Sequence, residues 1–171
     1  MIKDLDLKNL IDDIEYLKYE ASSLHQVIEF VPYTEKPLDG ASILEIFLTI
    51  DSIQAQIIEL LNEPGSESKH NREVVFRRIE LSSEEVKERS IDVITSSIIK
   101  NRIELLEYLE GNKKSFYEVE LNFQDAAISI FELLSKMIKE ERALLKNVAD
   151  LVMTYQKDRQ FQREIMNKPR G

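Results

Sequence analysis

Two charged side chains that interrupt apolar helical repeats are the residues best suited to chemistry in this chain. Glu141 interrupts a repeat in steps of three and four over residues 130–155, and Arg102 interrupts another over residues 91–109. A buried carboxylate without a partner is costly, so Glu141 needs a cation, a hydrogen-bond donor or a raised pKa. We expect it at the mouth of the core or in a polar pocket, with Arg102 as its partner if the two helices face each other. Alternatively, Arg102 runs its stem along the core edge and places its guanidinium in water.

Metal-binding side chains give two weak patterns. Asp51, Glu140 and Glu141 would suit a hard cation such as Mg²⁺ or Ca²⁺ if the fold brought them together. Glu67 and His70 have the Glu-x-x-His spacing of di-iron helical proteins. Such a site needs a second pair and two further glutamates, so we interpret this spacing as chance. We therefore expect no metal and no other cofactor.

The composition excludes several kinds of site. The chain has no Cys, which removes thiolate nucleophiles, disulfides, zinc fingers and iron–sulfur ligation. Its two histidines, His25 and His70, cannot supply a three-histidine metal site, and His25 beside the apolar stripe of the first helix fits a surface or boundary position. The net charge of −9, from 32 acidic and 23 basic residues, argues against nucleic acid as a partner.

No stretch of the sequence resembles a signal peptide or a membrane span. The chain meets charged residues at once, and its most apolar run, residues 43–50, contains Glu45 and is followed by Asp51. A spanning helix needs roughly 20 apolar residues. We therefore expect a cytoplasmic protein of bacterial type that does not enter a membrane.

Apolar spacing and capping residues predict one all-α domain, residues 1–171, built as an antiparallel four-helix bundle. The helices are expected at residues 7–31, 42–63 and 82–109, and from 125 or 129 onward. Serine–glutamate capping boxes at 42/45, 82/85 and 129/132 mark three helix starts. Residues 74–79 are expected to form a short cover over the core. Residues 112–124 alternate like a strand, but a lone strand has nothing to pair with, so we interpret them as an irregular connection.

Three segments of the sequence are similar to helix signatures of the DinB/YfiT-like superfamily. Residues 42–51 (SILEIFLTID) resemble its second-helix signature, residues 100–109 (KNRIELLEYL) its third, and residues 129–148 (SIFELLSKMIKEERALLKNV) its fourth. The resemblance covers roughly residues 5–152. It implies a four-helix bundle that binds a divalent metal through one histidine of the second helix and two of the fourth.

The departures from the superfamily pattern bear on function. The positions that match the metal ligands are Thr49, Glu140 and Leu144, of which only Glu140 is a good donor. The resemblance therefore implies a metal-free, degenerate member that binds a small ligand or a partner protein. The alternative is a thiol-dependent transferase or isomerase with relocated ligands, and a third interpretation is a helical adaptor unrelated to the superfamily. A residual polar pocket would hold Asp51, Glu140, Glu141 and Arg102.

The last helix is expected to be longer than the others. No Gly or Pro interrupts residues 129–168, which allows about 38 helical residues. The end of this helix, the overhang, would project beyond the other helices and expose Tyr155, Phe161, Ile165 and Met166 to water. We therefore expect a homodimer that buries these side chains, as DinB-like proteins are commonly dimers. Alternatively, the helix breaks near Tyr155, and residues 157–171 fray or fold back.

Overall fold

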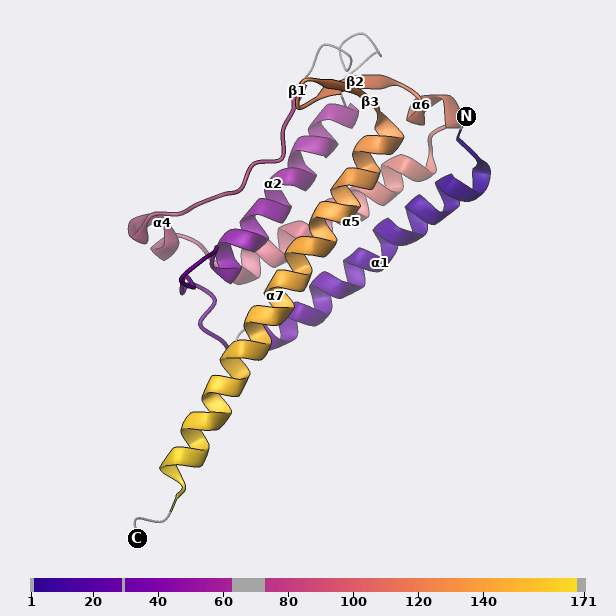
Figure 1. Cartoon of the computed structure of the whole chain (residues 1–171). Coiled ribbons are helices and arrows are strands. Elements are labelled where there is room, and N and C mark those ends of the chain that lie inside the picture. Colours follow the sequence, from indigo (N-terminus) through magenta and orange to yellow (C-terminus); the bar gives the residue numbers. More distant parts are fainter. Residues whose placement is uncertain (1, 29, 63–72, 169–171) are drawn as a thin grey trace.

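The structure, a computed structural model, describes residues 2–28, 30–62 and 73–168, and most of these are helical (Figure 1). The long helices of this part of the chain are α1 (Asp4–Ile28), α2 (Ile43–Asn62), α5 (Ile91–Glu110) and α7 (Ile130–Met166). The shorter elements are α4 (Ser83–Lys87), α6 (Lys114–Tyr117), β1 (Glu73–Val74), β2 (Glu120–Phe123) and β3 (Ala126–Ser129). No helix among the described residues has the length and apolar character needed to cross a membrane.

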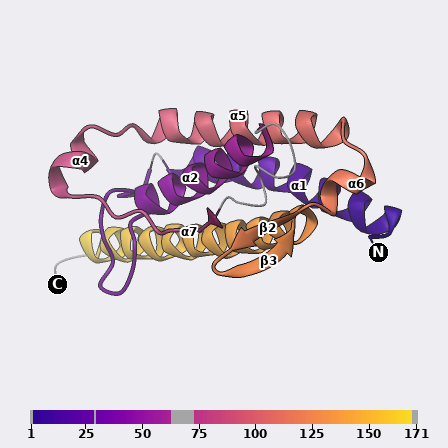
Figure 2. The same cartoon turned by 90° about the horizontal axis from the view of Figure 1, so that it is seen from above.

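The four long helices share one core. α1 contacts α5 and α7, and α2 contacts the same two helices, so α1 and α2 lie between α5 and α7 (Figure 2). α1 and α7 run in one direction, and α2 and α5 run in the opposite one (Figure 1). The predicted antiparallel packing therefore holds for α1 with α5 and for α2 with α7. The other two contacting pairs, α1 with α7 and α2 with α5, are parallel.

The buried residues explain why these helices form and pack. α1 buries one stripe in steps of three and four, which includes Leu10, Ile14 and Leu17. α2 is more deeply buried, because every residue from 42 to 50 is hidden from solvent. This run includes two polar residues, Glu45 and Thr49, whose partners belong to the candidate site.

A small sheet corrects the prediction that the chain is entirely helical. β2 pairs in parallel with β1 and antiparallel with β3, so the strand-like residues do find partners. The antiparallel pair closes through Gln124 and Asp125, both of which have positive φ, as a two-residue hairpin turn requires. Neither residue is Gly or Asn, so the usual sequence signal of such a turn was missing.

Two predicted helices have different ends in the structure. The continuous third helix is wrong: α4 stops at Lys87, and α5 begins anew at Ile91. No side chain of α4 is fully buried, and only the partly buried Val86 packs against the core, so little apolar contact holds α4 in line with α5. The first helix ends at Ile28 rather than at Val31, although Val31 is still buried.

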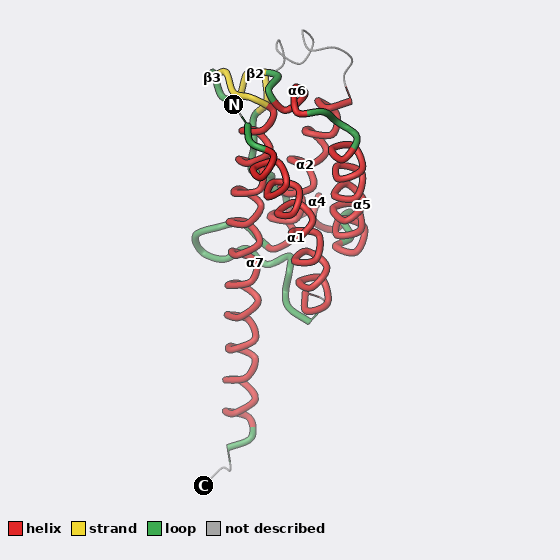
Figure 3. The backbone as a smooth tube through the Cα atoms, turned by 90° about the vertical axis from the view of Figure 1, so that its right-hand side faces the viewer, coloured by secondary structure: helices red, strands yellow, loops and turns green. Residues whose placement is uncertain are grey.

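The predicted long C-terminal helix is confirmed. α7 runs without a break for 37 residues, roughly 55 Å at 1.5 Å per residue, so the alternative of a break near Tyr155 is wrong. All residues from 156 to 168 are exposed, and the end of α7 projects beyond the other helices (Figure 3). Arg159 makes one contact back to the body, because its Nη1 donates to the Phe30 carbonyl at 3.3 Å.

Candidate functional site

A cavity of about 380 Å³ lies where α2, α7 and two connecting segments meet. One segment precedes α2 and contributes Lys36 and Ala41, and the other is residues 75–82, which we call the strap. Thr49 of α2 and Leu144 of α7 also line this cavity. Two of the three positions matched to the superfamily's metal ligands therefore face the same space.

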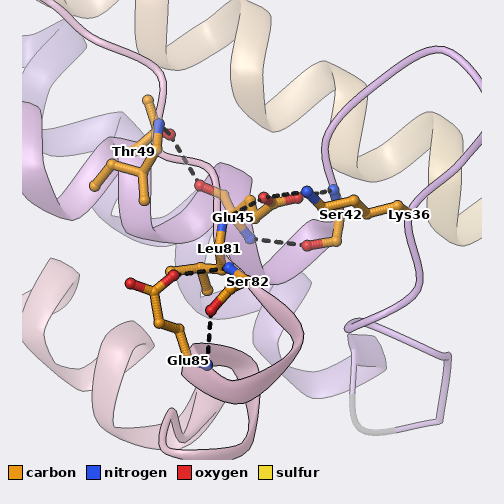
Figure 4. A network of polar contacts seen from close by, with 8 residues as sticks. Lys36, Ser42, Glu45, Thr49, Leu81, Ser82 and Glu85 are labelled. Carbon is orange, nitrogen blue, oxygen red and sulfur yellow. Dashed lines mark hydrogen bonds and ion pairs between the residues drawn. The ribbon is translucent and has the colours of Figure 1, made fainter.

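Glu45 is the buried anion of this cavity. Its carboxylate is 1% exposed and accepts hydrogen bonds from the Ser42 N–H at 2.9 Å and the Leu81 N–H at 2.7 Å (Figure 4). Lys36 Nζ lies 3.1 Å from the same carboxylate and is half exposed. One side chain thus joins the segment before α2, the start of α2 and the strap.

The balance at Glu45 favours its charged form. Burial raises the pKa of this carboxyl, but the hydrogen bonds from the Ser42 and Leu81 backbone, from Lys36 and from the Ser42 hydroxyl together lower it further. The net pKa lies below the ordinary value of 4.5. Glu45 is therefore a fixed negative charge at neutral pH.

Thr49 holds the strap one turn further along α2. Its hydroxyl donates to the Glu45 carbonyl at 2.9 Å and accepts from the Ile79 N–H at 3.0 Å. The strap then enters α4 through the capping box of Ser82 and Glu85 (Figure 4). Thr49 at the matched ligand position thus has a structural partner of its own.

Glu140 reaches the cavity through Arg78 of the strap. Arg78 lines the cavity, and its Nη2 lies 2.7 Å from Glu140 Oε1. Both side chains are partly exposed, so this ion pair is open to water. The three matched positions, Thr49, Glu140 and Leu144, are therefore gathered around one cavity, either in its lining or one contact behind it.

Arg102 and Glu141 form a buried ion pair, as expected if their helices face each other. Arg102 Nη2 donates to Glu141 Oε2, and the two side chains are 2% and 1% exposed. The alternative with the guanidinium in water is therefore wrong. Burial lowers the pKa of Arg102 to about 10, which still leaves it protonated at neutral pH.

Asp51 belongs to a different contact from the other members of the predicted pocket. Its Oδ1 accepts from Ser97 Oγ at 2.7 Å and from Asn101 Nδ2 at 2.9 Å, which ties α2 to α5. The structure thus divides the predicted set into three separate contacts, of which only one joins two members, Arg102 and Glu141. Among the described residues, no group of three or more His, Asp or Glu is placed to hold a metal ion.

His25 lies at the boundary of the core, as predicted. Its Nδ1 is 2.9 Å from Thr95 Oγ1, and its Nε2 is 3.5 Å from Asp92 Oδ1. Thr95 is buried, so this Asp–His–Thr arrangement has no hydroxyl that a substrate can reach. Glu67 and His70 lie outside the described residues.

The sequence missed the residues that give the cavity its charge. Lys36 and Arg78 lie in connections without periodicity, so no pattern linked them to α2 or α7. A signal did exist for Glu45, because its capping box opens a helix that is apolar over most of its circumference. The glutamate of such a box must be buried and therefore needs more donors than the cap supplies.

Comparisons with models of protein families, with curated proteins and with solved structures find no match for this chain.

Proposed function

We propose that this protein works by binding a small molecule in the cavity between α2, α7 and the strap. The observation that carries the proposal is that Thr49 and Leu144 line one cavity of about 380 Å³, while Glu140 pairs with Arg78 of the same lining. These positions were matched to superfamily ligands from sequence alone, and their grouping supports a DinB-like bundle with an altered site. Cytoplasmic location belongs to the same proposal.

The lining indicates an amphipathic ligand. Ala41, Ile46 and Leu144 offer apolar surface, while Lys36 and Arg78 bring cations that are half exposed. A short hydrocarbon chain that ends in an anionic group would match the apolar lining, and its charged end would share Lys36 with Glu45 and Arg78 with Glu140. Binding rather than metal chemistry follows from the donor set, because leucine cannot ligate and a threonine hydroxyl is a poor ligand for zinc or nickel.

Titration with saturated carboxylates from butyrate to octanoate, followed by ¹H–¹⁵N NMR, tests the proposal. We expect shifts at the amides of Thr49, Ile79 and Leu144. Ala41→Trp should abolish them, because Ala41 lines the cavity and an indole at this position would fill it. Ala149→Trp is the matched control, because Ala149 lines a groove between α1 and α7 instead. Shifts elsewhere, no shifts, or shifts that survive Ala41→Trp contradict the proposal.

A separate variant tests the DinB-like alignment. Thr49→His, Glu140→His and Leu144→His together should create affinity for zinc or nickel, measurable by calorimetry, if the three positions correspond to the superfamily ligands. A folded triple variant that binds neither metal contradicts the alignment. The second candidate function, a thiol-dependent transferase or isomerase, would need metal in the unaltered protein, which elemental analysis of an untagged preparation detects.

We further propose that the protein is a homodimer that uses the overhang of α7. Phe161, Ile165 and Met166 are exposed there, and an isolated helix would leave them in water. Residues 157–171 carry five basic and two acidic residues, so this segment is net +3 while residues 1–156 carry −12. A second copy therefore offers both apolar cover and charge of the opposite sign.

Sedimentation of the full chain beside a version that ends at Thr154 tests the dimer. We expect a dimer for the full chain and a monomer for the truncated one. Phe161→Ser with Ile165→Ser keeps the length and charge of the overhang and should also weaken association, since residues four apart share a helix face. A monomeric full chain, or a truncated chain that still dimerises, contradicts the proposal.

A further inference from the structure

The centre of the core contains four polar atoms without a hydrogen-bond partner among the described residues. They are Nε2 and Oε1 of Gln54, Nη1 of Arg102 and Oε1 of Glu141. All three side chains are at least 98% buried. A buried polar atom that stays unpaired destabilises the fold, and the great majority of buried polar atoms in proteins do have a partner.

These three side chains lie at one level of the core. α2 and α5 run side by side in the same direction, with Asp51 against Ser97 and Asn101, and Leu61 against Tyr108. Gln54 follows Asp51 by three residues, and Arg102 follows Asn101 by one. At 1.5 Å per residue this places Gln54 and Arg102 within a few ångströms of the same height.

The ion pair crosses the middle of the core at this level. α5 and α7 lie on opposite sides of α1 and α2 (Figure 2). Arg102 of α5 therefore reaches between α1 and α2 to meet Glu141 of α7. Gln54 comes from α2, one of the two helices in between, and is fully buried. We call Gln54, Arg102 and Glu141 the polar layer.

The free atoms of the polar layer are complementary to water. Two of them, Gln54 Nε2 and Arg102 Nη1, are donors, and two, Gln54 Oε1 and Glu141 Oε1, are acceptors. Buried water molecules typically make about three hydrogen bonds to such groups. We propose that the polar layer is a binding site for an internal water molecule that bridges Gln54 to the Arg102–Glu141 pair.

The polar layer lies about one turn of α7 away from the cavity between α2, α7 and the strap. Leu144, which lines that cavity, follows Glu141 by three residues on α7. This inference does not depend on the proposed ligand, because it rests on the polar layer alone.

Magnetic relaxation dispersion of ²H and ¹⁷O in water tests the proposal, because it counts water molecules that stay bound longer than the protein tumbles. We expect the count to fall by at least one in Gln54→Leu. Gln56→Leu is the matched control, since it makes the same change two residues away on α2 at a partly exposed position. An unchanged count in folded Gln54→Leu overturns the proposal.

A crystal structure of the unaltered protein decides the question if Gln54→Leu fails to fold. We expect a density peak within about 2.7–3.2 Å of both Arg102 Nη1 and Glu141 Oε1. A Gln54 amide that bonds directly to both atoms, with no such peak, overturns the proposal.

Discussion

Glu45 and Glu141 are equally hidden from solvent, yet the protein stabilises them in different ways. Glu45 lies in the first turn of α2, where backbone N–H groups lack helical partners, and it accepts from Ser42 and Leu81. Glu141 lies in the middle of α7, where the backbone N–H groups are already used. Its partner has to be a side chain, and the one that reaches it is Arg102 from across the core.

The comparison teaches that helix position decides how a buried carboxylate is satisfied. Near a helix start, the positive end of the helix dipole and short backbone bonds favour the anion, which agrees with the lowered pKa of Glu45. In the interior of a helix, the charge of Glu141 is balanced by a single side chain, that of Arg102. The second carboxylate oxygen, Oε1, has no partner among the described residues. The first arrangement tolerates the loss of one contact better than the second.

The largest effect is expected when the core pair is broken. Glu141→Gln keeps the shape of the side chain but leaves the Arg102 guanidinium buried without a counter-charge, which should cost about 3–5 kcal/mol of unfolding free energy. Glu140→Gln is the matched control, because its pair with Arg78 is exposed and should be worth about 0–1 kcal/mol. Urea unfolding of both variants measures the difference, and equal losses would show that Glu141 is not paired in solution.

Replacing both partners of the core pair should have the opposite result. Arg102→Leu with Glu141→Met and Gln54→Leu removes both charges and the buried Gln54 amide, and keeps most of the volume. Because buried ion pairs are often no better than well-packed apolar groups, we expect stability near that of the unaltered protein or up to about 1–4 kcal/mol higher. A triple variant that is as unstable as Glu141→Gln would mean that the polar layer contributes net stability to the core.

The core pair also shows how far sequence reasoning reaches. Interrupted apolar stripes located Arg102 and Glu141, because one helical period fixes which residues face inward, and they gave the pairing as one of two alternatives for Arg102. The same reasoning missed the hairpin at Gln124 and Asp125, whose backbone takes positive φ without Gly or Asn. It extended the third helix through residues 88–90, because propensity alone cannot show that α4 packs on the core only through the partly buried Val86.

The site depends on contacts that no local pattern encodes. Glu45 was evident as a capping residue, but its bond to Leu81 joins residues 36 positions apart. Arg78 meets Glu140 across an even longer separation, through a strap with no periodicity. Side chains on irregular connections are placed by the packing of the whole chain, so the partners of Glu45 and Glu140 could not be predicted from the sequence.

A smaller effect, and one that depends on pH, is expected at Glu45. Glu45→Gln replaces one acceptor oxygen by a donor and should cost about 1–3 kcal/mol at pH 7. Because the folded-state pKa of Glu45 is lowered, its contribution is present above the unfolded value of about 4.5 and is lost as pH falls through the folded pKa. The stability curves of the two proteins should therefore converge below pH 4.5.

Glu85→Gln is the matched control for Glu45, since it changes the same position of an exposed capping box. It should lose less stability than Glu45→Gln at pH 7, because its box holds α4 alone and does not tie three segments together. Thermal unfolding from pH 7 to pH 3 measures both variants. A gap between Glu45→Gln and the unaltered protein that stays constant over this range contradicts the assigned role of the carboxylate.

The smallest effect is expected at Thr49, which contacts the strap at Ile79, separately from the contact of Glu45 with Leu81. Thr49→Val keeps the size of the side chain but removes the acceptor of the Ile79 N–H, which should cost about 1 kcal/mol. Thr154→Val is the matched control, because its hydroxyl donates only to the Asp150 carbonyl of its own helix. Hydrogen exchange at the Ile79 amide reports the contact directly, and exchange should accelerate in Thr49→Val and not in Thr154→Val.

Since Glu45 still holds Leu81, the strap should loosen at Ile79 while the Leu81 amide stays protected. Loss of protection at both amides would mean that the strap is held as one unit and that Thr49, rather than Glu45, is its main anchor.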